Sequence, residues 1–351
     1  MKNKIAIASA FVAASSFSMG EIVVNDFLSF EGFVDSSYSH TDAEAGSVNE
    51  SDNSFQVDQV EISWLFDFDA VTAQIDLEYE DGDNGEEDGV EQAFVNYALG
   101  NGDVVTAGRY ASMLGFEAYE PTGLYQYSTA YDIAGFDGAL ASEYNQGVKY
   151  TRTSDTTFFG ISVQDEAFGD NGDEDGFGNN DADPDRLGGD GDSSYAVEVA
   201  GSMDLGNGFT VFAGAAFEDA DLGDNQLINA YVTYETGAWL FAAEINVAEF
   251  SDYDAGTEDL DVTSGLLMAN YAYSDVASVT ARISMIEAEL GNDDLDITKY
   301  TLAHNYALSD NLLLVTEVSF ADGDLDLTDD GSDNSIDGDA TTVAVELLFS
   351  F

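Results

Sequence analysis

Apolar and polar residues alternate with a period of two along most of the chain. The C-terminal segment is a clear case, and its apolar face consists of Thr341, Val343, Val345, Leu347, Phe349 and Phe351. The positions between them are small or polar, with Leu348 as the exception. Residues 71–80 and 239–250 alternate in the same way. Since successive side chains of a strand point to opposite faces, the pattern predicts strands with one apolar side and one wet side.

The alternation predicts about sixteen strands of about ten residues each, a length that suits strands tilted across a bilayer. They are expected at 27–39, 54–66, 71–80, 90–99, 104–110, 139–151, 157–166, 193–203, 209–218, 226–234, 239–250, 262–273, 277–289, 296–306, 312–320 and 340–351. After residue 20, no stretch reaches the roughly 18 consecutive apolar residues of a membrane helix. The predicted fold class is therefore all-β, a transmembrane antiparallel β-barrel.

The connections between these strands alternate between two kinds. Short turns are expected at 67–70, 100–103, 153–156, 204–208, 235–238, 274–276 and 307–311. Longer, mostly acidic loops are expected at 40–53, 81–89, 111–138, 167–192, 219–225, 251–261, 290–295 and 321–339. Short turns on one rim and long loops on the other are typical of outer-membrane barrels, whose short turns face the periplasm and whose long loops face outward.

A soluble secreted β-sandwich, β-helix or propeller would also show alternating strands. Three features favour the membrane barrel over these. The chain ends on the apolar face with Phe351, aromatic residues such as Trp239 and Tyr306 gather near strand ends as in interfacial girdles, and the loop lengths alternate.

The N-terminus has the pattern of a signal peptide. Lys2 and Lys4 form a basic start, 5–14 is mainly apolar, and Ser18 to Gly20 resembles a cleavage site. A transmembrane anchor is the weaker interpretation, because an apolar run of about ten residues is about half of what a spanning helix needs. The predicted organisation is a signal peptide at 1–20, which implies export, and one outer-membrane barrel at 21–351.

The composition excludes several classes of protein. The 351 residues contain 70 Asp and Glu against 8 Lys and Arg, which gives a formal net charge of −62 at pH 7. Nucleic-acid binding depends on basic residues that neutralise phosphates, so no nucleic-acid partner is expected. The absence of cysteine excludes disulfides, thiolate metal sites and a cysteine nucleophile. At 44% hydrophobic residues the chain is too apolar for an acidic disordered protein, so it should fold.

These features together resemble Gram-negative outer-membrane β-barrel proteins. The stretches Ala107-Gly108-Arg109-Tyr110 and Leu114-Gly115-Phe116-Glu117, followed by a Tyr-rich loop, resemble more narrowly the OmpL-like β-barrel porin family. The resemblance implies a passive diffusion channel, and porins often form homotrimers. It also implies that Phe349 and Phe351 belong to an assembly signal that the barrel-insertion machinery reads.

A barrel of about sixteen strands encloses a lumen wide enough for water. Inward-facing charges then decide what passes. The predicted pore-lining residues are Glu61, Asp76, Glu78, Arg109, Lys149, Glu244, Arg282, Lys299, Glu317 and Glu346. The basic members could face the acidic ones across the pore and create a transverse field, or each could pair locally with neighbouring carboxylates. Arg109 is the leading candidate for the constriction.

The loop at 111–138 differs from the others because it is rich in apolar and aromatic residues. Its candidate constriction residues are Phe116, Glu117, Tyr119, Glu120, Tyr125 and Tyr127. Such a loop should pack against something, either the inner barrel wall, the rim or a neighbouring protomer. Packing against the wall would narrow the pore.

The remaining loops are rich in Asp, Gly and Asn. Asn171, Asp173 and Asp175 match the opening of a Ca²⁺ loop, but Ala182 stands where the closing Glu is needed. A solvated run of charge explains the same residues, with Ca²⁺ or Mg²⁺ bound loosely at the acidic loops. So much like charge indicates a salty or divalent-rich habitat, because salt screens the repulsion. No other cofactor is expected.

The function predicted from the sequence is a porin, a water-filled and cation-selective channel for small hydrophilic solutes and ions across the outer membrane, surrounded by lipid. The alternatives are a non-conducting surface-structural or adhesin barrel and an outer-membrane hydrolase. A hydrolase would have only His40 and His304, which are predicted at opposite rims, so no shared catalytic site forms. The protein is not expected to be an enzyme.

Overall fold

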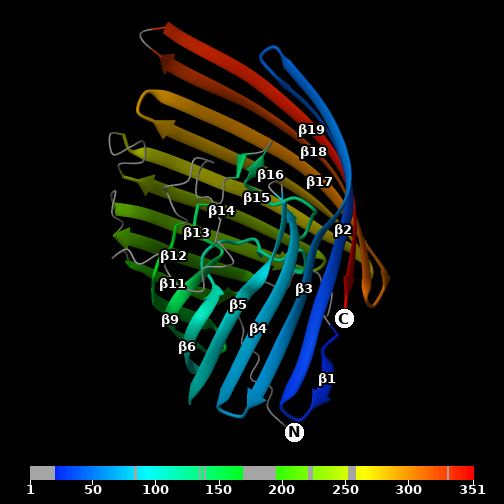
Figure 1. Ribbon diagram of the computed structural model, residues 1–351, viewed down its shortest axis with the longest axis vertical. Coiled ribbons are helices and arrows are strands. Elements are labelled where there is room, and N and C mark those ends of the chain that lie inside the picture. The colour runs from blue at the N-terminus through cyan, green and yellow to red at the C-terminus, as the bar shows by residue number, and fades with distance from the viewer. Residues whose placement is uncertain are drawn as a thin grey trace.

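Sixteen antiparallel strands close into a ring in the part of the chain that the computed structural model describes (Figure 1). Described are residues 20–82, 85–133, 136–137, 140–168, 195–219, 224–251, 258–329 and 332–351. The ring consists of β2 (Leu28–Ala45), β3 (Val48–Phe68), β4 (Val71–Gly82), β5 (Gly85–Gly100), β6 (Asp103–Ala111), β9 (Tyr144–Thr153), β10 (Thr157–Gln164), β11 (Tyr195–Gly206), β12 (Phe209–Asp219), β13 (Asp224–Thr236), β14 (Trp239–Phe250), β15 (Leu260–Ser274), β16 (Ala277–Leu290), β17 (Asp293–Ser309), β18 (Leu312–Asp329) and β19 (Ser332–Ser350).

Each strand of the ring pairs with the next one along the chain, and β19 pairs with β2 to close it. The short strand β1 (Ile22–Asn25) also pairs with β2. A closed sheet leaves no edge with unpaired backbone groups, which is the condition for β-structure inside a bilayer. The all-β barrel predicted from the sequence is confirmed. Among the described residues, no helix is both long enough and apolar enough to cross a membrane.

The two faces of the sheet differ as the alternation predicts. On β19, Val343, Val345, Leu347 and Phe349 are exposed on the outside, whereas Glu346 and Leu348 are buried on the inside. Other strands present the same kind of apolar outer surface, formed by exposed side chains that include Ile62, Ile75, Val95, Val232, Phe241, Ile245, Leu267, Ile283, Tyr300, Leu302 and Val318. This surface can face lipid.

The seven short turns predicted from the sequence are confirmed. The strands that flank them are separated by only two or three residues. Asn101-Gly102 and Asn207-Gly208 have positive φ at both positions, at 56° and 85° and at 58° and 86°. Asn-Gly is the preferred pair for such two-residue hairpins, because both central residues must adopt a left-handed conformation.

The opposite rim differs from the prediction. Four segments expected as loops continue for the most part as paired strand, namely 40–53, 81–89, 290–295 and 321–339. The hairpins β2–β3 and β18–β19 extend well beyond the neighbouring strands (Figure 1). β3 alone has 21 residues, about twice what crosses a bilayer. The acidic segments keep the two-residue alternation, with Leu325 opposite Ile336 and Asp324 opposite Asp337, so the backbone ladder continues. The many acidic residues of these segments suggested loops, although the two-residue alternation of apolar and polar positions indicates strands.

Candidate functional site: an acidic barrel interior and its inward loop

A long segment between β6 and β9 lies against the inner wall of the barrel. We call residues 112–143 the inward loop. It contains the short 3-10 helix η1 (Pro121–Gly123) and the two-residue strands β7 (Asp132–Ile133) and β8 (Phe136–Asp137). Its described parts make polar and apolar contacts with strands on several sides of the ring.

Three glutamates of the wall accept hydrogen bonds from this loop. Glu198 of β11 accepts from the Met113 amide at 2.6 Å, and Glu244 of β14 accepts from the Phe116 amide at 2.7 Å. Glu317 of β18 accepts from the hydroxyl of Ser128 at 2.7 Å. Hydrogen bonds to a carboxylate are stronger than those between neutral groups, so these contacts hold the loop at three points around the ring.

Apolar contacts hold the same loop against β12 to β16. The ring of Phe116 meets Tyr231 edge to face, with centroids 5.7 Å apart, and Tyr231 stacks on Phe212 at 4.5 Å. Leu114 and Tyr125 are buried in the same cluster. Burying a side chain of this size contributes about 1.5–3 kcal/mol. The loop therefore covers the part of the inner wall that carries these apolar side chains.

Two glycines of the wall leave room for the loop. A Cβ at Gly214 of β12 would lie 2.3 Å from Cδ2 of Leu114, and one at Gly160 of β10 would lie 2.2 Å from Sδ of Met113. Any larger residue would push the loop side chains away. The wall and the loop therefore have complementary shapes.

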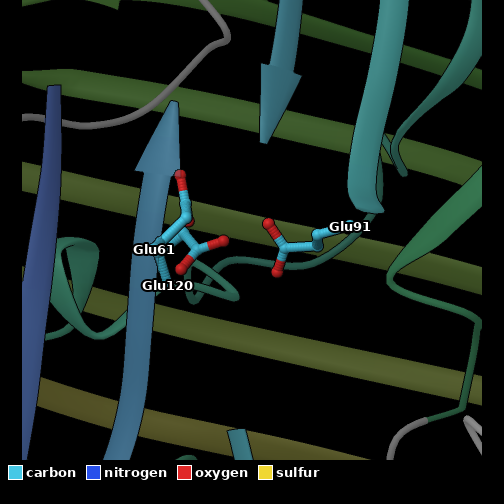
Figure 2. A group of neighbouring side chains, drawn as sticks. All are labelled: Glu61, Glu91 and Glu120. Carbon is cyan, nitrogen blue, oxygen red and sulfur yellow. The ribbon is translucent and has the colours of Figure 1, made fainter. Parts of the chain in front are cut away.

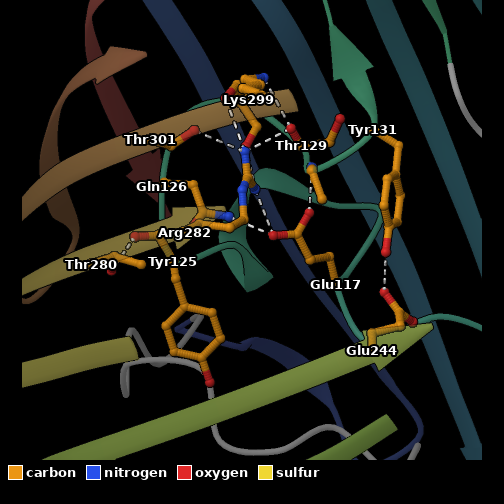
Figure 3. A network of polar contacts seen from close by, with 12 residues as sticks. Glu117, Tyr125, Gln126, Thr129, Tyr131, Glu244, Thr280, Arg282, Lys299 and Thr301 are labelled. Carbon is orange, nitrogen blue, oxygen red and sulfur yellow. Dashed lines mark hydrogen bonds and ion pairs between the residues drawn. The ribbon is translucent and has the colours of Figure 1, made fainter. Parts of the chain in front are cut away.

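The two basic residues of β16 and β17 bind the loop rather than the open lumen (Figure 3). The Arg282 guanidinium donates to Glu117 at 2.6 Å, to the Ser128 carbonyl at 2.9 Å and to the Thr129 carbonyl at 2.7 Å. Lys299 donates to the same Thr129 carbonyl at 3.1 Å. The Arg282 side chain has no exposed surface. The charge of Arg282 is therefore neutralised by Glu117. This agrees with local pairing of the basic residues and not with an electric field across the open pore.

The third basic residue of the inner wall is held in a similar way. Lys149 of β9 donates to the Ala111 carbonyl at 3.1 Å, at the start of the loop, and its ammonium lies 4.2 Å from the centroid of the Tyr110 ring. On the other side of the loop, the hydroxyl of Tyr131 donates to Glu244 at 2.9 Å. Burial, together with the nearby charge of Glu244, raises the pKa of the Tyr131 hydroxyl, so it keeps the proton that it donates.

Acidic side chains gather on the facing wall, formed by β3, β4 and β5. Glu61 and Asp76 are buried on its inner face, and Gln59 donates to both Glu78 at 2.5 Å and Glu120 of the loop at 3.2 Å. The carboxylates of Glu61, Glu91 and Glu120 lie next to one another (Figure 2). Here the contact between the loop and the wall is made largely by acidic side chains.

A cavity of about 1030 Å³ lies beside the inward loop. It is lined by Glu120 and Tyr119 of the loop, by Gln92 and Asn96 of β5, and, near the short-turn rim, by Asp155. The lumen is thus open between the loop and that rim, and polar side chains form much of its wall.

The predicted pore-lining residues fall into two groups. Those on the inner face are Glu61, Asp76, Glu78, Lys149, Glu244, Arg282, Lys299, Glu317 and Glu346. Arg109 is different. It pairs in register with Ala93, which pairs with Ile75 of the apolar outer face, whereas Thr106 and Tyr110 carry the inner face of β6. On this register, the prediction that Arg109 lines the pore is wrong, because the sequence alternation was placed one residue out of phase at the end of β6.

The remaining candidate residues belong to the inward loop, to the C-terminus and to segments outside the described residues. Phe116, Glu117, Tyr119, Glu120, Tyr125 and Tyr127 are all in the inward loop. Phe351 lies 6.3 Å from the ring centroid of Phe30, and Phe349 lies on the outer face of β19. The Ca²⁺ candidate at Asn171, Asp173 and Asp175 lies outside the described residues, and so do residues 1–19 of the signal peptide predicted at 1–20.

Sequence reasoning missed Glu91. The register of β4 with β5 shifts here, with Asp76 opposite Gln92 and Leu77 opposite Val90, so Glu91 is the extra residue of a β-bulge. A bulge redirects a side chain that simple alternation would place elsewhere. No residue type in the sequence indicates this bulge. The alternation of the strand alone therefore could not predict that Glu91 points into the barrel.

Comparison with known proteins defines the class. The chain belongs to the family described as "Putative beta-barrel porin-2, OmpL-like", whose model matches residues 28–351. It is a porin-family protein of the outer membrane, as the resemblance in the sequence implied. No curated protein matches it.

Solved structures with the same fold include other outer-membrane proteins. OmpT of Vibrio cholerae is similar with a TM-score of 0.62 at 15% identity, over 95% of this chain and 100% of that one. The outer membrane channel DcaP of Acinetobacter baumannii has a TM-score of 0.62 at 13% identity, over 92% and 97%. Salmonella typhi OmpF has a TM-score of 0.58 at 14% identity, over 95% and 100%. At such identities the likeness shows the fold.

Proposed function

We propose that this protein is a passive diffusion channel for small hydrophilic solutes and ions, and that it prefers cations. The observation that carries the proposal is the imbalance of charge on the inner wall. Lys149 donates to the Ala111 carbonyl at the end of β6, and Arg282 binds the inward loop, where it is paired with Glu117. Acidic side chains outnumber basic ones on the inner face of the described strands, and Glu61, Asp76 and Glu78 gather there on β3 and β4.

A wall on which carboxylates outnumber bases raises the local concentration of cations and lowers that of anions. The effect is strongest where the pore is narrow, because low-dielectric walls focus the field. We place this narrow region at the cavity beside Glu120 of the inward loop, which Gln92 and Asn96 of β5 also line. Salt weakens the preference, because the Debye length falls from about 10 Å at 0.1 M to about 3 Å at 1 M.

Reversal potential in a planar bilayer tests the selectivity. With KCl at unequal concentrations on the two sides, the account predicts a reversal potential whose sign is that of a potassium-selective channel. Its magnitude should be largest at low salt. A potential of the sign set by chloride would contradict it. The same recording addresses a non-conducting structural barrel, which would give no current.

Export and assembly complete the proposal. Residues 1–20 serve as a signal peptide, and the terminal aromatics Phe349 and Phe351 serve as the signal for the barrel-insertion machinery. The family favours a channel over an enzyme, and we propose no catalytic activity. We also propose a homotrimer, because porins often form homotrimers.

A further inference from the structure

The three carboxylates of Glu61, Glu91 and Glu120 form a compact cluster on the inner wall. One carboxylate oxygen from each of the three lies within 4.8 Å of the other two. Glu61 comes from β3, Glu91 from β5 and Glu120 from the inward loop, so the cluster joins three separate parts of the chain (Figure 2). The charged groups that act on Glu61 and Glu91 from nearby are also acidic, namely Asp76 and Glu78.

Glu91 supplies a second and independent observation. Only 7% of its surface is exposed, and its Oε2 atom is buried without a hydrogen-bond partner among the described residues. A buried carboxylate oxygen with no partner is costly, so proteins usually satisfy it. The β-bulge at Glu91 directs this side chain into the cluster. A cation bound there would satisfy the buried oxygen.

The partners of the other two carboxylates orient the cluster. The hydroxyl of Tyr144 donates to Oε1 of Glu120 at 2.6 Å, and Gln59 donates to its Oε2 at 3.2 Å. Ser63 donates to Glu61. The donors of these bonds lie outside the cluster and orient both carboxylates. Metal ligands in proteins are oriented by hydrogen bonds of the same kind.

We propose that Glu61, Glu91 and Glu120 bind one Ca²⁺ ion, which ties the inward loop to the wall of β3 and β5. Ca²⁺ takes six to eight oxygen ligands at about 2.3–2.6 Å, so two ligands of one ion can be about 5 Å apart, which matches the spread of these oxygens. Glu120 also lines the cavity beside the loop, from which water can complete the coordination. Mg²⁺ fits less well, because it demands near-ideal octahedral geometry.

This ion would bind the loop three residues beyond the contact of Arg282 with Glu117, but from a different wall of the barrel. Arg282 attaches the segment at Glu117 to β16, and the Ca²⁺ ion attaches Glu120 to β3 and β5. The loop would then be fixed on two facing walls. The proposal concerns binding and stability, so it can hold or fail whether or not the barrel conducts.

Calcium titration of the full-length barrel in detergent tests the site. Isothermal titration calorimetry in about 0.5 M KCl suppresses loose condensation at exposed acids, because the Debye length there is only a few ångströms. Wild type should bind one Ca²⁺ ion with a dissociation constant on the order of 10⁻⁴ M. Glu91→Gln and Glu120→Gln should each weaken this binding at least roughly tenfold, because fewer charged ligands lower the affinity.

Glu249→Gln is the matched control. Glu249 lies on β14 and accepts a hydrogen bond from Gln226, far from the cluster in the ring of strands, and the change removes the same single charge. It should leave the Ca²⁺ affinity unchanged. Equal binding by wild type, Glu91→Gln and Glu120→Gln would overturn the site, and so would equal loss in Glu249→Gln.

Thermal unfolding gives a second readout whose sign depends on the ion. In EDTA, Glu91→Gln should unfold at a higher temperature than wild type, because it removes repulsion from the cluster. In 5 mM Ca²⁺, an amount well above the expected dissociation constant of about 10⁻⁴ M, wild type should gain more stability than Glu91→Gln, because the variant binds the ion more weakly. If Glu91→Gln fails to fold, Glu61→Gln makes the same comparison. An identical Ca²⁺ shift in wild type and variant would refute the proposal, and an equal shift with Mg²⁺ would refute the choice of Ca²⁺.

Discussion

Arg282 of β16 and Glu117 of the inward loop are joined by an ion pair of 2.6 Å that is almost completely enclosed. The pair explains how a loop of mixed composition stays inside a barrel whose interior is strongly acidic. The loop brings an acid to one of the few basic residues of the wall and offers backbone carbonyls to its remaining donors.

Breaking this pair should loosen the loop. Arg282→Met leaves Glu117 buried without its cation, and the loss of one partner of a buried pair costs about 3–5 kcal/mol. The barrel should therefore unfold at lower urea in lipid vesicles, and single-channel recordings should show larger and noisier conductance. Arg152→Met is the control, because Arg152 pairs with Asp103 at 3.7 Å on an exposed surface, where a pair is worth at most about 1 kcal/mol. Equal effects of the two changes would show that the loop does not depend on Arg282.

The fit of the loop to the wall can be tested at Gly214. Gly214→Ala places a Cβ 2.3 Å from Leu114, and such overpacking should cost about 1–3 kcal/mol in urea unfolding. Gly201→Ala on the neighbouring strand meets only the Phe158 carbonyl at 3.4 Å and should be close to neutral. The double variant Gly214→Ala with Leu114→Ala should lose less than the sum of the single changes. Strict additivity would mean that Leu114 is not seated against Gly214.

Neutralising the acidic wall should weaken the preference for cations. Glu61→Gln, Asp76→Asn and Glu78→Gln together remove three charges from the proposed narrow region, so the reversal potential in a KCl gradient should move toward zero. Asp294→Asn, Asp322→Asn and Asp326→Asn remove three charges from the hairpins beyond the membrane and should shift it less. If the second triple variant has the larger effect, the selectivity filter lies at the mouth and not beside Glu120.

The terminal aromatic should matter for assembly. Phe351 packs near Phe30 and Phe349, and its amide and carbonyl both bond to Gly32 at 3.0 Å. Phe351→Ala should lower the amount of folded barrel recovered from outer membranes several-fold. Phe27→Ala removes another aromatic that is exposed on the outer face and should change the yield little. The folded fraction can be read from the heat-modifiable mobility of the barrel on gels, and equal yields would argue against the assembly role of Phe351.

The sequence could predict the strands and the turns because both follow from local rules. The alternation around Val343 to Phe349 and the Asn-Gly pairs at 101–102 and 207–208 each specify their structure within a few residues. The hairpin at 321–339 shows the limit of composition, because a run of aspartates was taken for a loop although its period continued.

The interior was harder to predict because its geometry depends on contacts far apart in the chain. The alternation placed Arg282 and Glu317 on the inner face, but that they bind the inward loop follows only from where the loop lies. Leu348, the exception in its strand, packs inside with Phe33, Leu313 and Val315, which no period explains. Glu91 and Arg109 were misplaced or missed because one residue of register decides which face a side chain takes.

Conductance of the purified protein in a planar lipid bilayer tests the account most directly. In 1 M KCl, the account predicts discrete upward steps of current as single barrels insert, and at lower salt a reversal potential with the sign set by potassium. A folded and inserted barrel that carries no current above that of the lipid alone would contradict the channel, whatever the outcome at the Ca²⁺ site.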